Sequence, residues 1–145
     1  MIREMTADDK SVYFEMSKKF YAAGVTNSVI DACGREKFWN EILSREIVKA
    51  YIIEYEDRVA GYSVCCVSAS QEACGRLLWV DELYIEPEFR SKGLGREFFK
   101  FIETKKDYEY IRLEYEKENE RAVKLYKSLG FKDCGYLSLY KKTEG

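Results

Sequence analysis

The segment EPEFRSKGLGREFF, residues 86–99, joins two regions with different hydrophobic patterns. The residues before it, GRLLWVDELYI (75–85), read as a strand that is halted by Pro87, the single proline of the chain. The residues after it follow a helical period, because Leu94 and Phe98 begin one apolar stripe. A cationic turn with two glycines therefore lies between a strand and a helix.

This turn has the features of an anion-binding site. The first amides of a helix lack partners within the helix and carry a partial positive charge. Glycines let the backbone approach an anion closely. Arg90, Lys92 and Arg96 add positive charge beside Gly93 and Gly95. These features together predict a pyrophosphate site.

Two common phosphate motifs do not fit the turn. A P-loop has its lysine directly after a glycine, whereas Lys92 precedes Gly93. A dinucleotide fingerprint, G-x-G-x-x-G, requires a glycine at the position of Phe98. The acyl-coenzyme A turn, Gln/Arg-x-x-Gly-x-Gly/Ala, matches completely from Arg90 to Gly95. A turn that only begins a helix is the alternative for so short a pattern.

The periodicity of the whole chain predicts a mixed α/β fold. We expect a central, twisted mixed sheet of about six to seven strands, with about four helices on its two faces. The passage from residue 77 to 116 should make a crossover between parallel strands. Strands are expected at 1–6, 48–70 (two, joined at 56–58), 75–87, 108–116 and 135–142, and helices from about 8 to near Gly24, at 34–45, from Leu94, and at 119–131.

The bulk composition limits the function classes. A chain of 145 residues is the size of one domain. Its net charge of −2, with both signs interspersed, offers no basic stripe for nucleic acid. It has no apolar stretch long enough to span a membrane, and its N-terminus lacks the apolar centre of a signal peptide. We therefore expect a cytoplasmic protein without a nucleic-acid or membrane partner.

The chain contains no histidine. This excludes a Ser-His-Asp triad, a Cys-His dyad and an H-E-x-x-H zinc site, and we expect no metal. Acid–base chemistry must therefore use carboxylates, tyrosines or lysines. The five cysteines show no C-x-x-C spacing, so we expect them to be reduced and to pack as small apolar residues.

Over nearly its whole length the chain resembles the Gcn5-related N-acetyltransferase (GNAT) superfamily. Two blocks carry the resemblance, LWVDELYIEPEFRSKGLGREFFKFIE (78–103) and NERAVKLYKSLGF (119–131). In that family the first block is the strand, turn and helix that hold acetyl-CoA. The second matches N-x-x-A-x-x-x-Y-x-x-x-G-F at all its fixed positions: Asn119, Ala122, Tyr126, Gly130 and Phe131.

The resemblance implies a single GNAT acetyltransferase domain, residues 1–145, with acetyl-CoA as co-substrate. The backbone of Leu83, Tyr84 and Ile85 would pair with the pantetheine arm much as another strand would. Asn119 would cap its helix and touch the pantetheine, with capping alone as the alternative. Amides of the turn would bind the CoA pyrophosphate; its residues are Arg90, Ser91, Lys92, Gly93, Leu94, Gly95 and Arg96.

The resemblance also implies catalytic residues. Tyr126 matches a tyrosine near the thioester sulfur, and a phenol with a pKa of about 10 can protonate the departing thiolate. Asp81 and Glu82 are candidates for the base or the amine anchor, and in a regular strand only one of them could point into the acceptor site. Asp81 is favoured because family members that act on polyamines and aminoglycosides carry an acid there. Glu82 comes second, and Glu114 and Glu116 could also reach the site.

The expected reaction is direct transfer of an acetyl group to a primary amine, with a small cationic metabolite resembling a polyamine or an aminoglycoside as acceptor. A protein N-terminus or a lysine is the alternative acceptor, and a non-catalytic acyl-CoA-binding module is the alternative of another class. The family suggests that residues 24–39 and the final segment, DCGYLSLY (133–140), contribute to the acceptor site. The sequence leaves open whether the chain forms a homodimer.

Overall fold

The computed structural model describes residues 1–23 and 30–143, and within them five strands form one sheet in the order β1-β2-β3-β4-β5. The first four strands are antiparallel neighbours, and β4 and β5 are parallel. The strands are β1 (Ile2–Glu4), β2 (Val48–Tyr55), β3 (Arg58–Ser70), β4 (Gly75–Ile85) and β5 (Tyr110–Leu113). The helices are α1 (Lys10–Ala22), α2 (Ala32–Ser44), α3 (Leu94–Thr104) and α4 (Glu120–Ser128), with short 3-10 turns at Ala7–Asp9 and Pro87–Phe89.

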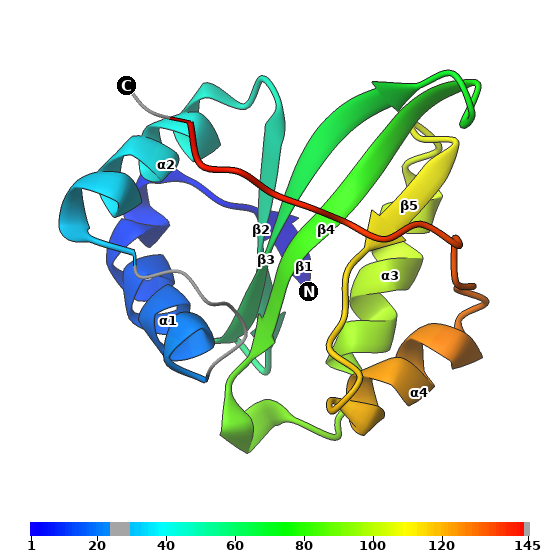
Figure 1. The fold of residues 1–145 in the computed structure, drawn as a ribbon. Helices are drawn as coiled ribbons and strands as arrows, with labels where there is room; N and C mark the ends of the chain where they lie inside the picture. The colour runs from blue at the N-terminus through cyan, green and yellow to red at the C-terminus, as the bar shows by residue number, and fades with distance from the viewer. Residues whose placement is uncertain (24–29, 144–145) are drawn as a thin grey trace.

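Two layers of helices cover the sheet (Figure 1). Helices α1 and α2 lie on one face, and α3 and α4 lie on the other. This arrangement confirms the predicted mixed sheet between helices. None of the helices in the described ranges is long and apolar enough to cross a membrane.

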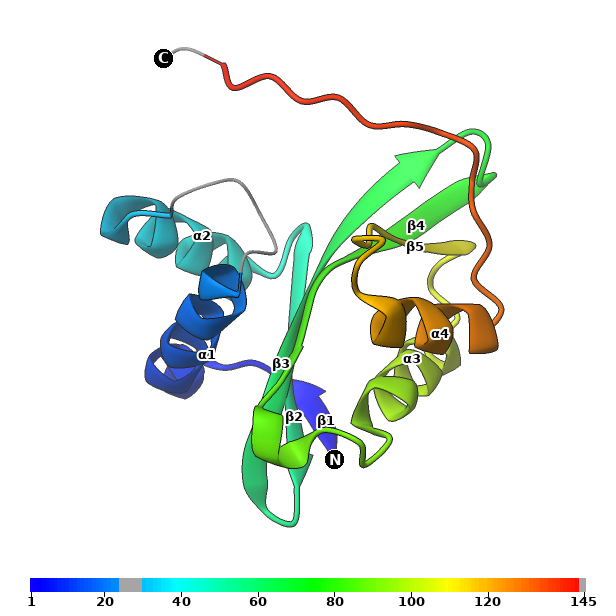
Figure 2. The same cartoon turned by 60° about the horizontal axis from the view of Figure 1, so that its bottom comes forward.

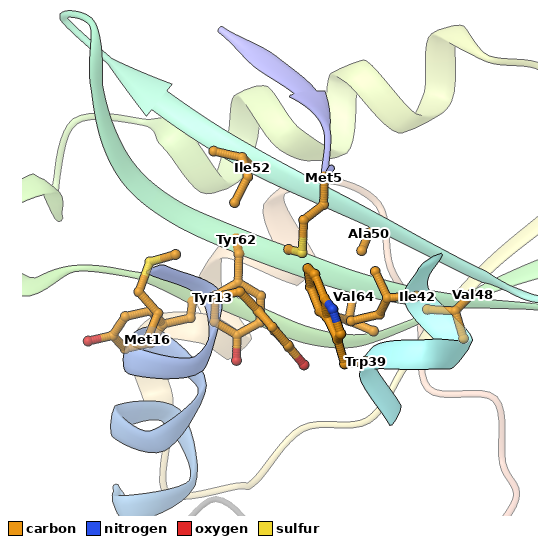
Figure 3. Packing of buried hydrophobic residues seen from close by; sticks show 11 residues of the cluster. Met5, Tyr13, Met16, Trp39, Ile42, Val48, Ala50, Ile52, Tyr62 and Val64 are labelled. Atoms are coloured by element: carbon orange, nitrogen blue, oxygen red, sulfur yellow. The ribbon is translucent and has the colours of Figure 1, made fainter. Parts of the chain in front are cut away.

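The α1/α2 face is filled by aromatic side chains (Figure 3). Tyr13 stacks on Trp39 with ring centroids 5.8 Å apart and meets the ring of Tyr62 edge-on at 5.1 Å. These rings pack with Met16 and Ile42, and all five side chains are at most 3% exposed. Because aromatic pairs add to the free energy of apolar burial, this layer forms a tightly packed core.

The opposite face is centred on α3. Phe98, Phe99 and Ile102 are at most 1% exposed and pack against Leu78 and Val80 of β4. The helical stripe predicted from Leu94 onward is therefore confirmed. This apolar stripe packs α3 against β4, the strand that precedes it in the sequence.

The last predicted strand does not form. Residues 132–143 are neither helix nor strand, and β5 is shorter than predicted. The described sheet thus has five strands instead of about six to seven. The alternation of GYLSLYKK favours a strand, but a strand needs a partner edge, and this segment runs away from the sheet (Figure 2).

The cysteines only partly follow the prediction. All five are free, and Cys65 and Cys66 face opposite sides of the sheet as adjacent strand residues should. Cys65 is buried and Cys66 half-buried, but Cys33, Cys74 and Cys134 are exposed. The expectation of apolar packing was therefore wrong for those three, because they lie on α2, a hairpin turn and the C-terminal segment.

Candidate active site

The glycine turn leaves the start of α3 open. Gly93 precedes the helix with φ of +81°, a left-handed conformation that favours glycine. The first helical bond runs from the Glu97 N–H to the Gly93 carbonyl at 3.0 Å. No side chain of the described residues caps this end of the helix. The amides of Leu94, Gly95 and Arg96 are therefore available to an anion.

Gly95 allows three elements to meet at this turn. A Cβ atom built on Gly95 would lie 3.1 Å from Cδ2 of Leu125 in α4 and 4.0 Å from Cδ2 of Leu83 in β4. A larger residue would push α4 away from α3. The second glycine therefore serves packing, whereas the first serves backbone conformation.

Cationic side chains surround the turn. Arg90 donates through Nε to the Ile85 carbonyl at 2.9 Å, and the Lys92 ammonium lies 5.1 Å from the centre of the Tyr55 ring. Arg121 of α4 donates to the Ser91 hydroxyl at 2.6 Å. An otherwise slightly acidic chain therefore concentrates positive charge here.

Sequence reasoning missed Arg121. It lies two residues after Asn119, inside the second motif block, and it reaches the turn only because α4 packs beside α3. Its side chain also lines an open depression at the start of α4, together with Asn119 and Lys124. The only sequence signal was an additional cation near the start of that helix.

The outer edge of β4 is unpaired beyond Val80. β5 pairs with β4 only from Leu77 to Val80, although β4 continues to Ile85. In the part of the chain that the structure describes, no other strand pairs with this edge. The two parallel strands therefore separate and leave a length of free backbone next to the glycine turn.

Backbone alternation shows which groups face this free edge. The Glu86 N–H bonds to the Ala60 carbonyl of β3 at 2.8 Å. Since the groups of successive residues point to opposite sides of a strand, those of Tyr84 face β3, and those of Leu83 and Ile85 face outward. Only Leu83 and Ile85 can thus offer hydrogen bonds to an extended ligand along β4.

A β-bulge interrupts β4 at the predicted acidic pair. Val64 of β3 pairs with Glu82, whereas the next residue, Cys65, pairs with Val80, so Asp81 is the extra residue. Val80 packs on the α3 side, and Leu83 packs on that same side. The bulge therefore turns the side chains of both Asp81 and Glu82 toward the α1/α2 face. The expectation that only one could point there was wrong, because it assumed a regular strand.

Glu82 is a buried carboxylate among tyrosines. Glu82 is only 4% exposed, and its carboxylate accepts a hydrogen bond from the Tyr62 hydroxyl at 2.9 Å. Tyr21 of α1 donates a second hydrogen bond to it. Burial raises the pKa of Glu82 to about 7, although these two hydrogen bonds act in the opposite direction. Glu82 can therefore take up or release a proton near neutral pH.

Asp81 is exposed beside this buried group. Its carboxylate lies next to the Cys66 thiol, whose pKa is raised to about 12 by burial and by the hydrogen bond to Asp81. Burial and the charges of Glu82 and Asp81 raise the pKa of Tyr21. The two carboxylates thus form one acidic surface on the α1/α2 side of the bulge.

Tyr126 lies on the other face of the sheet. Its ring packs edge-on against Phe99 and Phe131 at centroid distances of 5.8 and 6.0 Å. Burial raises its pKa, so the phenol is protonated at neutral pH. Asn119 caps the same helix by accepting from the Ala122 N–H at 3.3 Å. Tyr126 therefore lies on the α3 side of the sheet, and the acidic pair lies on the α1/α2 side.

Among the described residues, Glu114, Glu116 and the final segment are expected contributors to the acceptor site that are not assembled with it. Glu114 and Glu116 are exposed beyond the end of β5. The final segment, 133–140, extends past the sheet and does not form the last strand (Figure 2). Residues 24–29, part of the expected acceptor loop, lie outside the described residues.

The chain is similar to known acetyltransferases. The model of the "Acetyltransferase (GNAT) domain" family matches residues 46–133. The thialysine N-epsilon-acetyltransferase of Bos taurus is 30% identical over 106 residues, which cover 71% of this chain and 61% of that protein. The chain thus spans less than two thirds of this relative's length.

Two solved structures share the fold over the whole chain. A possible acetyltransferase from Clostridium difficile 630 is 25% identical, with a TM-score of 0.83 and coverage of 100% of this chain and 98% of that one. AAC(6')-Iy, in complex with the bisubstrate analog CoA-S-monomethyl-acetylneamine, has a TM-score of 0.80 at 16% identity, over 99% and 97% of the two chains. The second likeness concerns the fold alone.

Proposed function

Since the chain belongs to the GNAT acetyltransferase family, we propose that residues 1–145 form one catalytic domain that transfers an acetyl group from acetyl-CoA to a small cationic primary amine. A family model that covers most of the chain supports the acetyltransferase class. The acceptor is inferred from the charge and position of the residues around the β4 bulge.

The observation that carries the proposal is the free edge of β4. It leads from the open start of α3 to the bulge at Asp81. A pyrophosphate at the turn and a pantetheine arm along Leu83 and Ile85 would bring a thioester to the bulge. Donors and acceptors in extended backbone suit the two amides of pantetheine.

The acidic surface on one side of this edge suits an amine. A lysine-like amine has a pKa of about 10.4 and must lose a proton before it attacks. Asp81 is exposed and would hold the ammonium, while Glu82, with its pKa near 7, would accept the proton. The neutral nitrogen then forms a bond to the thioester carbonyl carbon.

Departure of the thiolate completes the transfer. Collapse of the tetrahedral intermediate breaks the carbon–sulfur bond, and Tyr126 would donate its proton to the sulfur from the α4 side. The nitrogen loses its second proton to solvent as the amide forms, and the proton on Glu82 replaces, through solvent, the one that Tyr126 lost. The products are the acetylated amine, free CoA and one proton released to solvent. No covalent acetyl-enzyme is needed, because the amine attacks the thioester directly.

The known relatives support a primary-amine acceptor. The bovine relative is named for acetylation of an ε-amine, and the analog bound to AAC(6')-Iy joins CoA to an acetylated neamine. A protein N-terminus or lysine is the second candidate acceptor. The exposed position of Asp81 would allow either, since nothing among the described residues covers it.

The test is release of free thiol from acetyl-CoA by the purified protein with a panel of amines. The panel should contain a polyamine, an aminoglycoside, free lysine, a lysine-containing peptide and a neutral alcohol as control. The proposal predicts the highest kcat/KM with a small di- or polycationic amine. Higher activity with the peptide would favour the second candidate, and acetyl-CoA binding without thiol release would indicate a non-catalytic module.

A further inference from the structure

Arg35 places a positive charge beside the acidic side of the candidate site. It lies near the start of α2 and is half-buried. Its Nη1 donates to the hydroxyl of Ser17 in α1 at 3.0 Å, and its guanidinium carbon lies 6.0 Å from the centre of the Phe14 ring. Ser17 is itself only 3% exposed, so this contact anchors the guanidinium between the two helices.

The face of α1 that contacts Arg35 also contacts Glu82. Tyr13, Ser17 and Tyr21 are spaced four residues apart, so they lie along one face of the helix. Tyr21 donates a hydrogen bond to Glu82. The ring of Tyr13 packs edge-on against the other tyrosine that donates to Glu82. Arg35 and Glu82 therefore approach the same row of α1 side chains, one from α2 and the other from β4.

The charge of Arg35 acts on this site through space. Burial raises the pKa values of Tyr13, Tyr21 and Glu82, and the guanidinium of Arg35 opposes each of these rises. Because the interaction between charges weakens with distance, the guanidinium must lie near all three groups. The acidic surface is thus bordered by a cation on the α2 side.

Most donors of Arg35 are not used by the part of the chain that the structure describes. A guanidinium has five N–H donors in a rigid fork, and only Nη1 takes part in the hydrogen bond to Ser17. Within residues 1–23 and 30–143, no carboxylate forms an ion pair with Arg35. A cation at this place would repel a purely cationic ligand, whereas its fork matches a carboxylate.

We propose that Arg35 binds a carboxylate of the acceptor and so selects, among small cationic amines, those that are diamino acids. This inference rests on the proposed transfer of acetyl groups to a small amine. A molecule with one carboxylate and a net positive charge must carry two ammonium groups, as lysine and ornithine do. The ammonium to be acetylated would lie at Asp81 and Glu82, and the carboxylate would accept hydrogen bonds from Arg35.

The test compares lysine with cadaverine, because cadaverine is lysine without its carboxylate. In the thiol-release assay, kcat/KM for lysine should exceed that for cadaverine at least about tenfold. Arg35→Gln should lower kcat/KM for lysine about tenfold to a hundredfold, mainly through KM, because a charged hydrogen-bonded pair is lost. The same variant should leave kcat/KM for cadaverine unchanged or higher, since it removes a repelling charge.

Lys37→Gln is the matched control, because Lys37 is an exposed cation two residues further along α2 and does not share a face with Arg35. It should leave the kinetics of both amines unchanged. If Arg35 only offset the charge of Glu82, Arg35→Gln would change both amines by the same factor, which would overturn the inference. A wild-type preference for cadaverine would overturn it too and leave the proposed transfer intact, whereas absence of thiol release with any amine would overturn both.

Discussion

The two halves of this molecule are packed to different degrees. Strands β1 to β4 with α1 and α2 form a continuous core in which Ile52, Tyr62 and Val64 are fully buried. In β5, α4 and the C-terminal segment, the apolar residues are half-buried or exposed. The first half can therefore stabilise the fold, whereas the second is left open where the cofactor is proposed to bind.

Within the tightly packed half, Glu82 is the exception, a buried carboxylate bonded to tyrosines. Glu82→Gln should lower turnover about a thousandfold, as expected for loss of a general base. It should also abolish the rise of kcat/KM with pH through about 7. Steady-state thiol release across pH measures both effects.

Glu114→Gln is the control for that variant, because Glu114 is an exposed carboxylate beyond β5. It should leave turnover and pH profile unchanged. Equal activity of Glu82→Gln and wild type would remove Glu82 from the mechanism.

Two substitutions that shorten an apolar side chain compare the packing of the two halves directly. Ile52→Ala should lower the free energy of unfolding by about 3 kcal/mol, because Ile52 is 0% exposed. Leu129→Ala, in the half-covered region after α4, should cost about 1 kcal/mol or less. Urea denaturation of both variants without ligand makes the comparison, and equal losses would contradict the difference in packing.

The next largest effect is expected at the glycine turn, where the CoA pyrophosphate is proposed to bind. Gly93→Glu should weaken acetyl-CoA binding about a hundredfold or more, because it strains a left-handed residue and adds an anion at the pyrophosphate site. Gly130→Glu is a matched control, since Gly130 has φ of +90° and equally open space. Calorimetric titration should show near-normal affinity for the control; equal loss in both would assign the effect to backbone strain.

The buried carboxylate also makes stability depend on pH. Its pKa is raised in the folded protein, so the folded state holds the proton more tightly than the unfolded state does. Stability is therefore lost as pH rises from about 4.5 to about 7, on the order of 3 kcal/mol in total. Glu82→Gln should become more stable relative to wild type between pH 5 and pH 8, measured by urea denaturation. A constant difference would show that Glu82 titrates normally.

The smallest expected effect concerns Tyr126, the proposed proton donor to the departing thiolate. Tyr126→Phe should slow acetyl transfer about tenfold to a hundredfold while leaving acetyl-CoA affinity intact, because only the hydroxyl is lost. Tyr110→Phe, half-exposed on β5, is the control. Full activity of Tyr126→Phe, in single-turnover measurements, would show that solvent protonates the thiolate.

Most of the architecture could be predicted from local pattern. The hairpin at residues 56–57, the stripe of α3 and the cap at Asn119 each depend on neighbouring residues, and the structure confirms them. The final strand could not be predicted correctly, because its formation depends on a partner edge that alternation does not reveal. The alternating sequence of this segment favours a strand, but in the described structure the segment has no partner edge and does not form one.

The residues of the candidate site could be predicted from the sequence, but their arrangement in space could not. Asp81, Glu82 and Tyr126 were identifiable from the two motif blocks, yet their orientation depends on the bulge. One extra residue in β4 places both carboxylates on one face of the sheet, and no pattern in the sequence predicts this bulge. Arg121 and Tyr62 reach the site through tertiary packing, so local reasoning could not find them.

The most direct test of the account is hydrogen exchange at the free edge of β4. At saturating acetyl-CoA, the amides of Leu83 and Ile85 should exchange markedly more slowly than in the free protein, because the pantetheine arm would accept their hydrogen bonds. The amide of Tyr84, already bonded to β3, should change less. Tight binding of acetyl-CoA with no protection at Leu83 or Ile85 would contradict the proposed cofactor position and the mechanism built on it.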